Sequence, residues 1–324
     1  MNLEQLRGFV EVARLGHFTR ASESLHLAQP SLSRQISTLE RELGAELFHR
    51  ARGHIGLTAA GEALLPRAQR MLAEAESIRE EMGELAGLRR GRVRLGAPPT
   101  LCISLVAEAI SAFHADHPGV DLHLDESGSR LLVEQLAVGA VDIALITESD
   151  GPPPSGFSLA RMPLLTEELV VVSAASAPPV AVTPAIGLEH LATLPLIALD
   201  ETYELRATTD AAFRSAGLTP NHVLEGAEMD ALLRFVERGV GVAVVPAMVL
   251  LDQPALRSVR LTHPMMRRTV SLAHRADVTP AVAVAAMRRV IVATAAEVAR
   301  RDPAITSLLE EARPANVTRL DSEE

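Results

Sequence analysis

Hydrogen-bonding side chains recur at helical spacing in the segment that begins at Pro30. Apolar residues recur every three or four positions along the same segment, at Leu32, Ile36, Leu39 and Leu43. This spacing predicts an amphipathic helix with one buried stripe. At about 100° per residue, the opposite face carries Pro30, Arg34, Ser37, Thr38 and Arg41. Hydroxyl and guanidinium groups donate hydrogen bonds to base edges and phosphates, so the chemistry this face offers is recognition of DNA.

The segments on either side of this helix predict a helix-turn-helix followed by a hairpin. Residues 19–27 predict a short helix, which only a brief turn separates from Pro30. Pro30 loses no hydrogen bond in the first helical turn, and Gly44 can adopt the left-handed conformation that ends a helix. Two helices joined so closely cross steeply and bring the N-terminal end of the second into the major groove. The strands expected within 45–50 and 55–58 form a wing.

A stripe of leucines by itself is more typical of a core helix, and the surrounding motifs favour the DNA-binding interpretation instead. These motifs are Leu3-Glu4-Gln5-Leu6, Phe18-Thr19-Arg20-Ala21, Gln29-Pro30-Ser31-Leu32-Ser33, Leu39-Glu40-Arg41-Glu42-Leu43-Gly44, Leu47-Phe48-His49-Arg50 and Leu57-Thr58-Ala59-Ala60-Gly61. In order and spacing they resemble the N-terminal domain of LysR-type transcriptional regulators. The resemblance is strong as far as Gly61 and looser beyond it. It implies a sequence-specific transcription regulator that responds to a small-molecule effector.

We expect nine residues of this domain to contact double-stranded DNA. Four of them match positions that face bases in the family it resembles, namely Gln29, Pro30, Ser33 and Arg34. Four are expected near phosphates, namely Ser31, Thr38, Arg50 and Arg52, the last two on the wing. Ser37 lies on the same helix face.

Composition and charge agree with a globular chain of two or three units. The 324 residues are 48% hydrophobic and only 2% aromatic, with a net charge of −10. The acidity lies away from the DNA-binding segment, because residues 1–94 hold 14 Arg and 12 acidic residues and the remainder holds 17 Arg and 29 acidic residues. No apolar run reaches the roughly 18 residues that a membrane span needs. The first helix is amphipathic rather than a signal peptide, so we expect a cytoplasmic protein without membrane contact.

A long helix with a heptad seam is predicted from Thr58 to about Leu88. Its apolar residues alternate steps of four and three, at Leu64, Ala68, Met71, Ala75, Ile78, Met82 and Leu85. Such a seam is typical of pairing with a second helix, which predicts a dimer. Packing of this helix on its own domain is the alternative. A dimer presents two recognition helices roughly 34 Å apart, which suits a partly palindromic operator. The family resemblance also implies association into tetramers.

Beyond Gly91 strand and helix patterns alternate, which predicts α/β architecture with a mainly parallel sheet. Two lobes with crossings near Met162 and His263 would resemble the type 2 periplasmic-binding-protein fold of LysR-type effector domains. The expected fold is thus an N-terminal all-α winged helix-turn-helix domain, a long linker helix and a C-terminal two-lobed α/β effector domain. The expected bounds are 1–58 for the DNA-binding domain, 59–90 for the linker and dimerisation helix, 91–301 for the effector domain (lobe I 91–162 and 264–301, lobe II 163–263) and 302–324 for a disordered tail.

Candidate effector-binding residues lie where strands end and helices begin, because free amides and the positive end of the helix dipole meet there. Thr100 is the first choice, since it follows a strand and can cap the next helix. The full set is Pro99, Thr100, Leu101, Ser127, Ser129, Thr147, Thr202, Gly226 and Met229. Scattered hydroxyls and few aromatic residues favour a small organic acid as effector.

Other classes of chemistry lack their motifs. The sequence has no Gly-x-Ser-x-Gly or P-loop motif, and Gly239-x-Gly241 lacks the third glycine of a dinucleotide site. Cys102 is the single cysteine, so no internal disulfide can form and no resolving thiol is present. We therefore expect no enzyme, no metal site and no cofactor. The alternative is a solute-binding or carrier protein that uses its N-terminal helices only to dock a partner; in the regulator interpretation, RNA polymerase is a possible partner.

Overall fold

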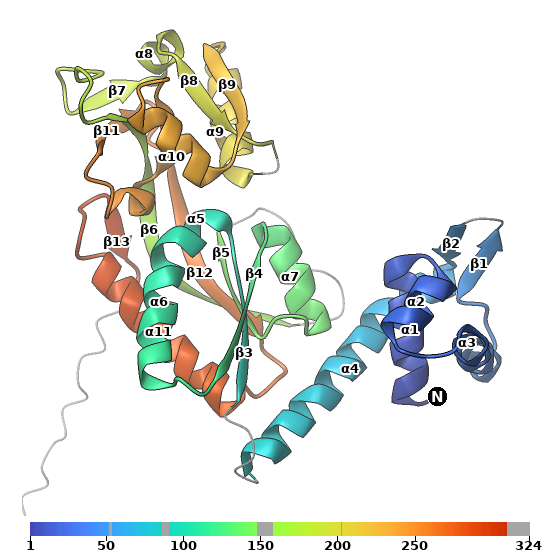
Figure 1. The fold of residues 1–324 in the computed structure, drawn as a ribbon. Helices are drawn as coiled ribbons and strands as arrows, with labels where there is room; N and C mark the ends of the chain where they lie inside the picture. Colours follow the sequence, from blue (N-terminus) through green and yellow to red (C-terminus); the bar gives the residue numbers. More distant parts are fainter. Residues whose placement is uncertain (52–53, 86–90, 148–157, 202, 310–324) are drawn as a thin grey trace, which may run out of the picture.

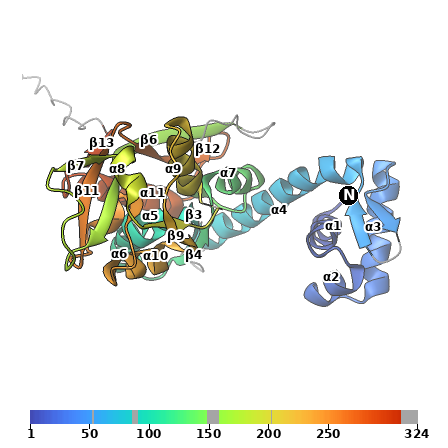
Figure 2. The same ribbon diagram turned by 90° about the horizontal axis from the view of Figure 1, so that it is seen from above.

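The computed structural model describes residues 1–51, 54–85, 91–147, 158–201 and 203–309. A single long helix, α4 (Ala59–Leu85), joins a small N-terminal domain to two larger lobes. Figure 1 shows the small domain at one end of α4 and the lobes stacked beside its other end. Seen from above, the small domain projects well clear of both lobes (Figure 2).

The N-terminal domain has the expected helix-turn-helix and wing. Its elements are α1 (Leu3–Leu15), α2 (Phe18–Ser24), α3 (Gln29–Leu43), β1 (Phe48–Ala51) and β2 (His54–Leu57). Three residues of the predicted stripe form its core, because Leu32, Ile36 and Leu39 are all fully buried. The fourth, Leu43, is corrected to an exposed residue: it is the last residue of α3 and 43% exposed. Gly44 ends α3 with φ +69°, as its position predicts. The predicted boundaries of the recognition helix are therefore confirmed to within one residue.

Helix α4 does not carry one free seam along its whole length. The Thr58 Oγ1 accepts a hydrogen bond from the Gly61 N–H at 3.1 Å and so caps the helix, as expected. Ala68 is fully buried in the N-terminal domain and Leu64 packs against the same core. These two predicted seam residues are corrected to core residues, because the first turns of α4 cover the apolar core of the N-terminal domain.

The later seam positions are open in the single chain. Met71, Ile78 and Met82 have exposed fractions of 43%, 52% and 51%, respectively, while Ala75 is half-buried. The side chain of Leu85 lies outside the described residues. Three large apolar side chains at helical spacing thus face away from the protomer's own core.

Lobe I is a mixed sheet with helices on its faces. Its first part comprises β3 (Arg92–Ala97), α5 (Pro99–Leu101), a π-helical turn (Cys102–Val106), α6 (Ala107–Asp116), β4 (Asp121–Glu126), α7 (Ser129–Val138) and β5 (Ile143–Thr147). β12 (Arg267–Arg275), α11 (Val282–Val298) and β13 (Ile305–Ser307) complete it. Strands β3, β4 and β5 are parallel, but β12 is antiparallel to β5. The expected mainly parallel sheet is therefore wrong for this half of the lobe, because the returning strand enters from the other lobe.

Lobe II is built from the middle of the chain. Its elements are β7 (Ala185–Gly187), α8 (Leu188–Thr193), β8 (Leu196–Leu199), α9 (Glu204–Ser215), β9 (His222–Ala227), α10 (Met229–Glu237), β10 (Ala243–Pro246), the 3-10 turn Ala247–Leu250 and β11 (Leu256–Thr262). One strand, β6 (Leu159–Ala174), runs through both lobes. It pairs with β12 up to Glu168 and with β10 from Leu169 onward.

The two crossings between the lobes differ in how well the sequence located them. The second lies between β11 and β12, at the predicted position near His263. The first lies at Glu168 and Leu169 rather than near Met162, because β6 continues without a break from one lobe into the other. The expected lobe boundary at 162 is corrected accordingly.

The start of the C-terminal tail is part of lobe I. Ile305–Ser307 forms β13 and pairs antiparallel with β6, and Ile305 is 3% exposed. The expectation of disorder from residue 302 is wrong for this strand, which covers an edge that β6 would otherwise leave open. Residues 310–324 lie outside the described part of the chain.

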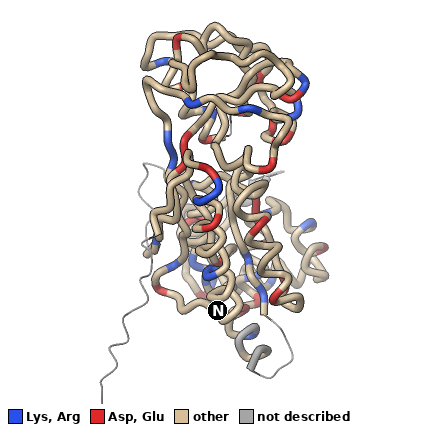
Figure 3. Tube along the Cα trace, turned by 90° about the vertical axis from the view of Figure 1, so that its left-hand side faces the viewer, with Lys and Arg blue, Asp and Glu red and all other residues tan. Residues whose placement is uncertain are grey.

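Charged residues are interspersed over both lobes rather than gathered by sign (Figure 3). Several of them pair where the lobes meet. Glu168 accepts hydrogen bonds from Arg260 at 2.6 and 2.8 Å and from Arg267 at 3.1 Å. Its carboxylate is 7% exposed, and the hydrogen bonds from Arg260 are the main cause that lowers its pKa. This cluster ties β6, β11 and β12 together at the crossing.

Candidate functional site

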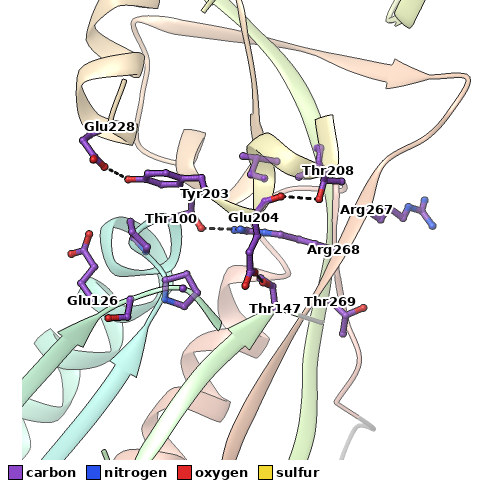
Figure 4. Close-up of a pocket in the computed structure, with 16 residues that line it drawn as sticks. Thr100, Glu126, Thr147, Tyr203, Glu204, Thr208, Glu228, Arg267, Arg268 and Thr269 are labelled. Atoms are coloured by element: carbon purple, nitrogen blue, oxygen red, sulfur yellow. Dashed lines mark hydrogen bonds between the residues drawn. The ribbon is translucent and has the colours of Figure 1, made fainter. Parts of the chain in front are cut away.

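A cleft of about 640 Å³ lies between the two lobes. Figure 4 shows side chains from both lobes and from the crossing strands pointing into it. Its lining consists of Pro98, Pro99, Thr100, Glu126, Ser127, Gly128, Thr147, Leu169, Tyr203, Glu204, Leu205, Thr208, Glu228, Arg267, Arg268 and Thr269. A cleft of this size accommodates a small molecule.

One polar cluster bridges the lobes. Glu204, the first residue of α9 in lobe II, accepts hydrogen bonds from the Thr147 Oγ1 at 2.7 Å and the Ser129 Oγ at 3.0 Å in lobe I. The two hydroxyl oxygens are 2.9 Å apart, and the Thr147 N–H donates to the Ser129 Oγ at 3.1 Å. Ser129 is 2% and Thr147 7% exposed. The site therefore holds a carboxylate oxygen with buried donors at the N-terminus of α7.

A second cluster centres on Arg268 of β12. The Arg268 Nη1 donates to the Thr100 Oγ1 at 2.8 Å, and its Nε donates to the Glu167 Oε1 at 2.8 Å. Glu167 is fully buried and its other oxygen accepts the Met248 N–H at 2.9 Å. Because Glu167 balances the charge of Arg268, the guanidinium acts mainly to orient the hydroxyl of Thr100 at the floor of the cleft.

A third contact lies on the opposite wall. The Tyr203 hydroxyl donates a hydrogen bond to the carboxylate of Glu228 (Figure 4). Burial, and then this hydrogen bond, raise the pKa of Tyr203 above its ordinary value. Tyr203 is the single tyrosine of a chain without tryptophan, so its fluorescence reports directly on the cleft.

The structure brings most of the predicted effector residues into this cleft. Pro99, Thr100, Ser127 and Thr147 line it, and Ser129 lies behind Thr147 within hydrogen-bond distance. Thr202 lies outside the described residues. The remaining predictions, Leu101, Gly226 and Met229, are not among the lining residues.

These three differences have local physical causes. Leu101 is fully buried on the core side of its helix turn, and Met229 is 2% exposed in the core beneath α10. Gly226 is an exposed residue of β9 with φ +81°, and a Cβ built on it would have no neighbour within 4 Å. Glu228, the residue before Met229, is the one that reaches the cleft. A strand end identifies the region, but only the packing of the helix identifies which side chain faces the ligand.

Sequence analysis missed Tyr203, Glu204, Arg267 and Arg268 among the lining residues. Tyr203 and Glu204 directly follow the predicted Thr202, so a wider window around that position includes them. Arg267 and Arg268 carry no local signal, because they enter the cleft only through the second crossing.

Cys102 lies close to this cleft but is held as a thiol. Its Sγ is 3.5 Å from the Ala97 carbonyl oxygen, and the side chain packs against the core of the lobe. Burial, with a smaller contribution from Glu126, raises the pKa of the Cys102 thiol to about 12. A thiol with so high a pKa is a poor nucleophile near neutral pH, which fits a packing role.

The second candidate surface is the polar face of α3. Gln29, Pro30, Arg34 and Ser37 are exposed, and Ser33 is half-buried on the same helix. Ser31, Arg34 and Thr38 line a hollow of about 310 Å³ between α3 and the start of α1. The side chain of Arg50 and the whole of Arg52 lie outside the described residues. The exposed N-terminal half of α3 is therefore free to enter a groove.

Comparison with known families is consistent with both surfaces. Residues 3–62 match the family described as bacterial regulatory helix-turn-helix protein, lysR family. Residues 86–296 match the LysR substrate binding domain, which covers the two lobes. The chain belongs to the LysR family of transcriptional regulators. As a LysR-type regulator it binds DNA through its helix-turn-helix domain and a small-molecule effector through its two-lobed domain. Members of this family are transcriptional regulators and not enzymes. The alternative of a solute-binding or carrier protein is therefore set aside.

Relatives of this LysR-type regulator extend along nearly the whole chain. It is 34% identical over 273 residues to the uncharacterized HTH-type transcriptional regulator YybE of Bacillus subtilis, covering 84% of this chain and 92% of the relative. It is 30% identical to a probable nitrogen assimilation transcriptional activator of Synechococcus elongatus, covering 84% and 88%.

Solved structures of LysR-type regulators share the fold. A full-length OxyR variant from Pseudomonas aeruginosa has a TM-score of 0.66 at 27% identity and covers 96% of this chain and 99% of its own. Full-length CbnR in complex with its target DNA has a TM-score of 0.62 at 22% identity, covering 92% of this chain and 100% of its own, a likeness of fold. In the part of this regulator that the structure describes, no helix is long and apolar enough to cross a membrane.

Proposed function

We propose that this regulator binds a partly palindromic operator as a dimer, and that a small organic acid in the cleft between its lobes changes that binding. The observation that carries the proposal is the carboxylate oxygen of Glu204 held by the buried hydroxyls of Ser129 and Thr147. A pocket that already satisfies one carboxylate with oriented donors has the chemistry to bind another.

On the DNA side, Gln29, Pro30, Ser33 and Arg34 contact base edges. Ser31, Thr38, Arg50 and Arg52 contact phosphates, and Ser37 lies beside them. The exposure of Gln29 and Arg34 on α3 supports this division. Phosphate contacts fix the register of the protein on the duplex, whereas base contacts carry the sequence preference. Because the N-terminal domain is only weakly basic, a few arginines supply its contacts to phosphates. Added salt weakens DNA binding by weakening these contacts.

The dimer forms along the outer half of α4. Met71, Ile78 and Met82 present large, exposed apolar side chains at helical spacing, which is the surface that a second copy of α4 can bury. Two DNA-binding domains joined in this way bind half-sites one helical turn apart. Pairing of dimers into tetramers through the lobes, contact with RNA polymerase and residence in the cytoplasm complete the proposal.

Closure of the lobes on the effector alters the orientation of the two DNA-binding domains. Helix α7 begins at Ser129 in the cleft and packs against α4. A change at one end of this helix therefore reaches the linker helix directly. A differential affinity of a few kcal/mol for the two arrangements is enough to shift their populations.

A mobility-shift assay with the DNA immediately upstream of the regulator's own gene tests the proposal. We expect a retarded complex at low ionic strength, a footprint with two related half-sites, and a changed footprint with one or more small organic acids from a metabolite panel. Absence of a complex with every promoter fragment near the gene would overturn the proposed operator. Arg34→Ala serves as the variant with impaired recognition.

A further inference from the structure

The cleft contains a carboxylate of its own that crosses from one lobe to the other. The Glu204 Oε2 lies 2.7 Å from the Thr147 Oγ1 and 3.0 Å from the Ser129 Oγ. Each hydroxyl has one proton to donate, and an ionised carboxylate can only accept. Both hydroxyls lie within donating distance of the same oxygen of Glu204.

The hydroxyl groups that hold Glu204 belong to buried side chains rather than to surface residues. Ser129 and Thr147 are nine-tenths or more buried, and their hydroxyls come from two elements, the start of α7 and the end of β5. The other oxygen of Glu204 lies beside Gly128, since a Cβ built there would be 4.0 Å from Oε1. Gly128 is the N-cap of α7, so the carboxylate sits at the positive end of that helix dipole.

Glu204 itself is exposed and can leave. It is the first residue of α9, its side chain is open to solvent, and its carboxylate can exchange these hydrogen bonds for water. The two donors are less free, because Ser129 and Thr147 can share one hydrogen bond with each other at 2.9 Å, but the second buried hydroxyl proton still needs an acceptor. Any solute that displaces Glu204 from this position must therefore supply a hydrogen-bond acceptor of its own.

We propose that Glu204 is a tethered competitor of the effector: it occupies the carboxylate position of the Ser129–Thr147 pair in the absence of effector, and an acid effector binds by displacing it. The inference rests on the proposed function of the cleft as an acid-binding site. It adds that Glu204 bridges the two lobes before the effector binds. The affinity of the cleft for acids then depends on the free energy needed to break the hydrogen bonds of Glu204 to Ser129 and Thr147.

Displacement also makes the effector response selective. An effector must present a carboxylate or an equivalent oxyanion to the two hydroxyls, since a neutral group leaves Glu204 in place. Glu126 and Glu228 line the same cleft, and together with the displaced carboxylate of Glu204 they repel a second negative charge on the effector. The two arginines of the lining, Arg267 and Arg268, are already paired with Glu168 and Glu167. Monocarboxylates are therefore favoured over dicarboxylates.

Acetate provides a direct test with the full-length protein. Glu204→Ala empties the site, and acetate supplies the missing carboxylate in solution. Fluorescence of Tyr203, the neighbouring residue and the sole tyrosine, reports on the site without a label. We expect acetate to restore the fluorescence of Glu204→Ala toward that of the unmodified protein, with an affinity for acetate about tenfold or more higher in the variant. Acetamide, which has the same shape without the charge, should have no effect.

Three further variants make the result specific. Glu201→Ala removes an exposed carboxylate from the same loop and should titrate with acetate like the unmodified protein. Adding Thr147→Val to Glu204→Ala should abolish the acetate effect, because one of the two donors is gone. Glu204→Gln keeps the size of the side chain but not its charge and should show intermediate affinity, which gives a second measurement if Glu204→Ala folds poorly.

Equal acetate affinity in Glu204→Ala and the unmodified protein, or no acetate effect on either Glu204 variant, would overturn the inference. Operator binding by the same proteins is measured in parallel by mobility shift. The operator complex and its response to organic acids can persist while the affinity for acetate is the same with and without Glu204. In that case the tethered competitor is wrong and the proposed function stands. If the acids have no effect on either the operator complex or the cleft, the proposed effector class is wrong as well.

Discussion

Gly139 lies directly against Ala73, because a Cβ atom built on Gly139 would be only 2.6 Å from the Ala73 Cβ. Gly139 ends α7 in the left-handed conformation, with φ +73°, and Ala73 belongs to α4. The same helix α7 starts at Ser129, which contacts Glu204 in the cleft. One helix of ten residues thus joins the effector cleft to the linker that carries the DNA-binding domain.

Gly139→Ala should disturb this junction. The new Cβ both strains a left-handed backbone and overlaps Ala73, so we expect the free energy of unfolding to fall by more than about 1 kcal/mol. Urea denaturation measures this. Gly217→Ala is the matched control, because Gly217 has φ +66° but the methyl group that alanine adds there meets no atom within 4 Å. Ala73→Gly removes the overlap but costs about 1 kcal/mol inside a helix, so it is measured alone and together with Gly139→Ala. The double variant should be more stable than the sum of the two single effects; strictly additive effects would assign the whole loss to backbone strain.

Arg34→Ala should relax the sequence preference of DNA binding. If Arg34 makes a bidentate contact to a guanine, its loss removes about 1 to 3 kcal/mol of discrimination at that base pair. Competition mobility shifts with single-base operator variants measure this quantity. Arg41→Ala removes the same charge from the same face of α3 two helical turns further on, outside the proposed base contacts, and should leave the base preference unchanged. Identical base preferences in the two variants would contradict the assignment of Arg34.

Ile78→Glu should dissociate the dimer. Ile78 is 52% exposed in the single chain and lies on the open face of α4, so a partner would have to bury the new charge. We expect the dissociation constant, measured by analytical ultracentrifugation, to rise about tenfold or more. Arg79→Glu places the same side chain at the next position, which is exposed and already paired with Glu76, and should leave the association state unchanged. A dimer that tolerates Ile78→Glu would place the interface elsewhere.

Glu168→Gln should remove a pH-dependent part of the stability. Hydrogen bonds from Arg260 lower the pKa of Glu168 from its ordinary value of 4.5, so the folded state favours the ionised form. This contribution is complete above about pH 4.5 and is lost as the pH falls through the lowered pKa. At pH 7 the substitution should cost about 1.5 to 3 kcal/mol, the range for hydrogen bonds to charged groups.

Urea denaturation at pH 7 and at acidic pH checks this sign. The difference between Glu168→Gln and the unmodified protein should shrink on acidification. Glu237→Gln, which breaks an exposed pair with Arg234, should change stability by less than about 1 kcal/mol at either pH. A difference for Glu168→Gln that stays constant with pH would mean that packing, not charge, is the source.

The amino-acid sequence by itself determined the elements and their order. The spacing of Leu32, Ile36 and Leu39 marked the buried face of α3, and Gly44 marked its end, because helix periodicity and the left-handed cap are local properties. The ends of predicted strands located Thr100 and Thr147 for the same reason. The apolar spacing along α4 predicted a covered face, which we assigned to a second copy of the helix, with the chain's own N-terminal domain as the alternative.

Only the tertiary structure decided which of these local features meet. Arg268 reaches Thr100 across 168 positions of the chain, and Glu204 reaches Thr147 across 57, because the strands cross twice between the lobes. Ala68 became a core residue where the first turns of α4 meet the N-terminal domain, while Ile78 on the same stripe stayed open. Periodicity fixes which way a side chain points from its own helix, whereas its partner depends on how distant segments pack.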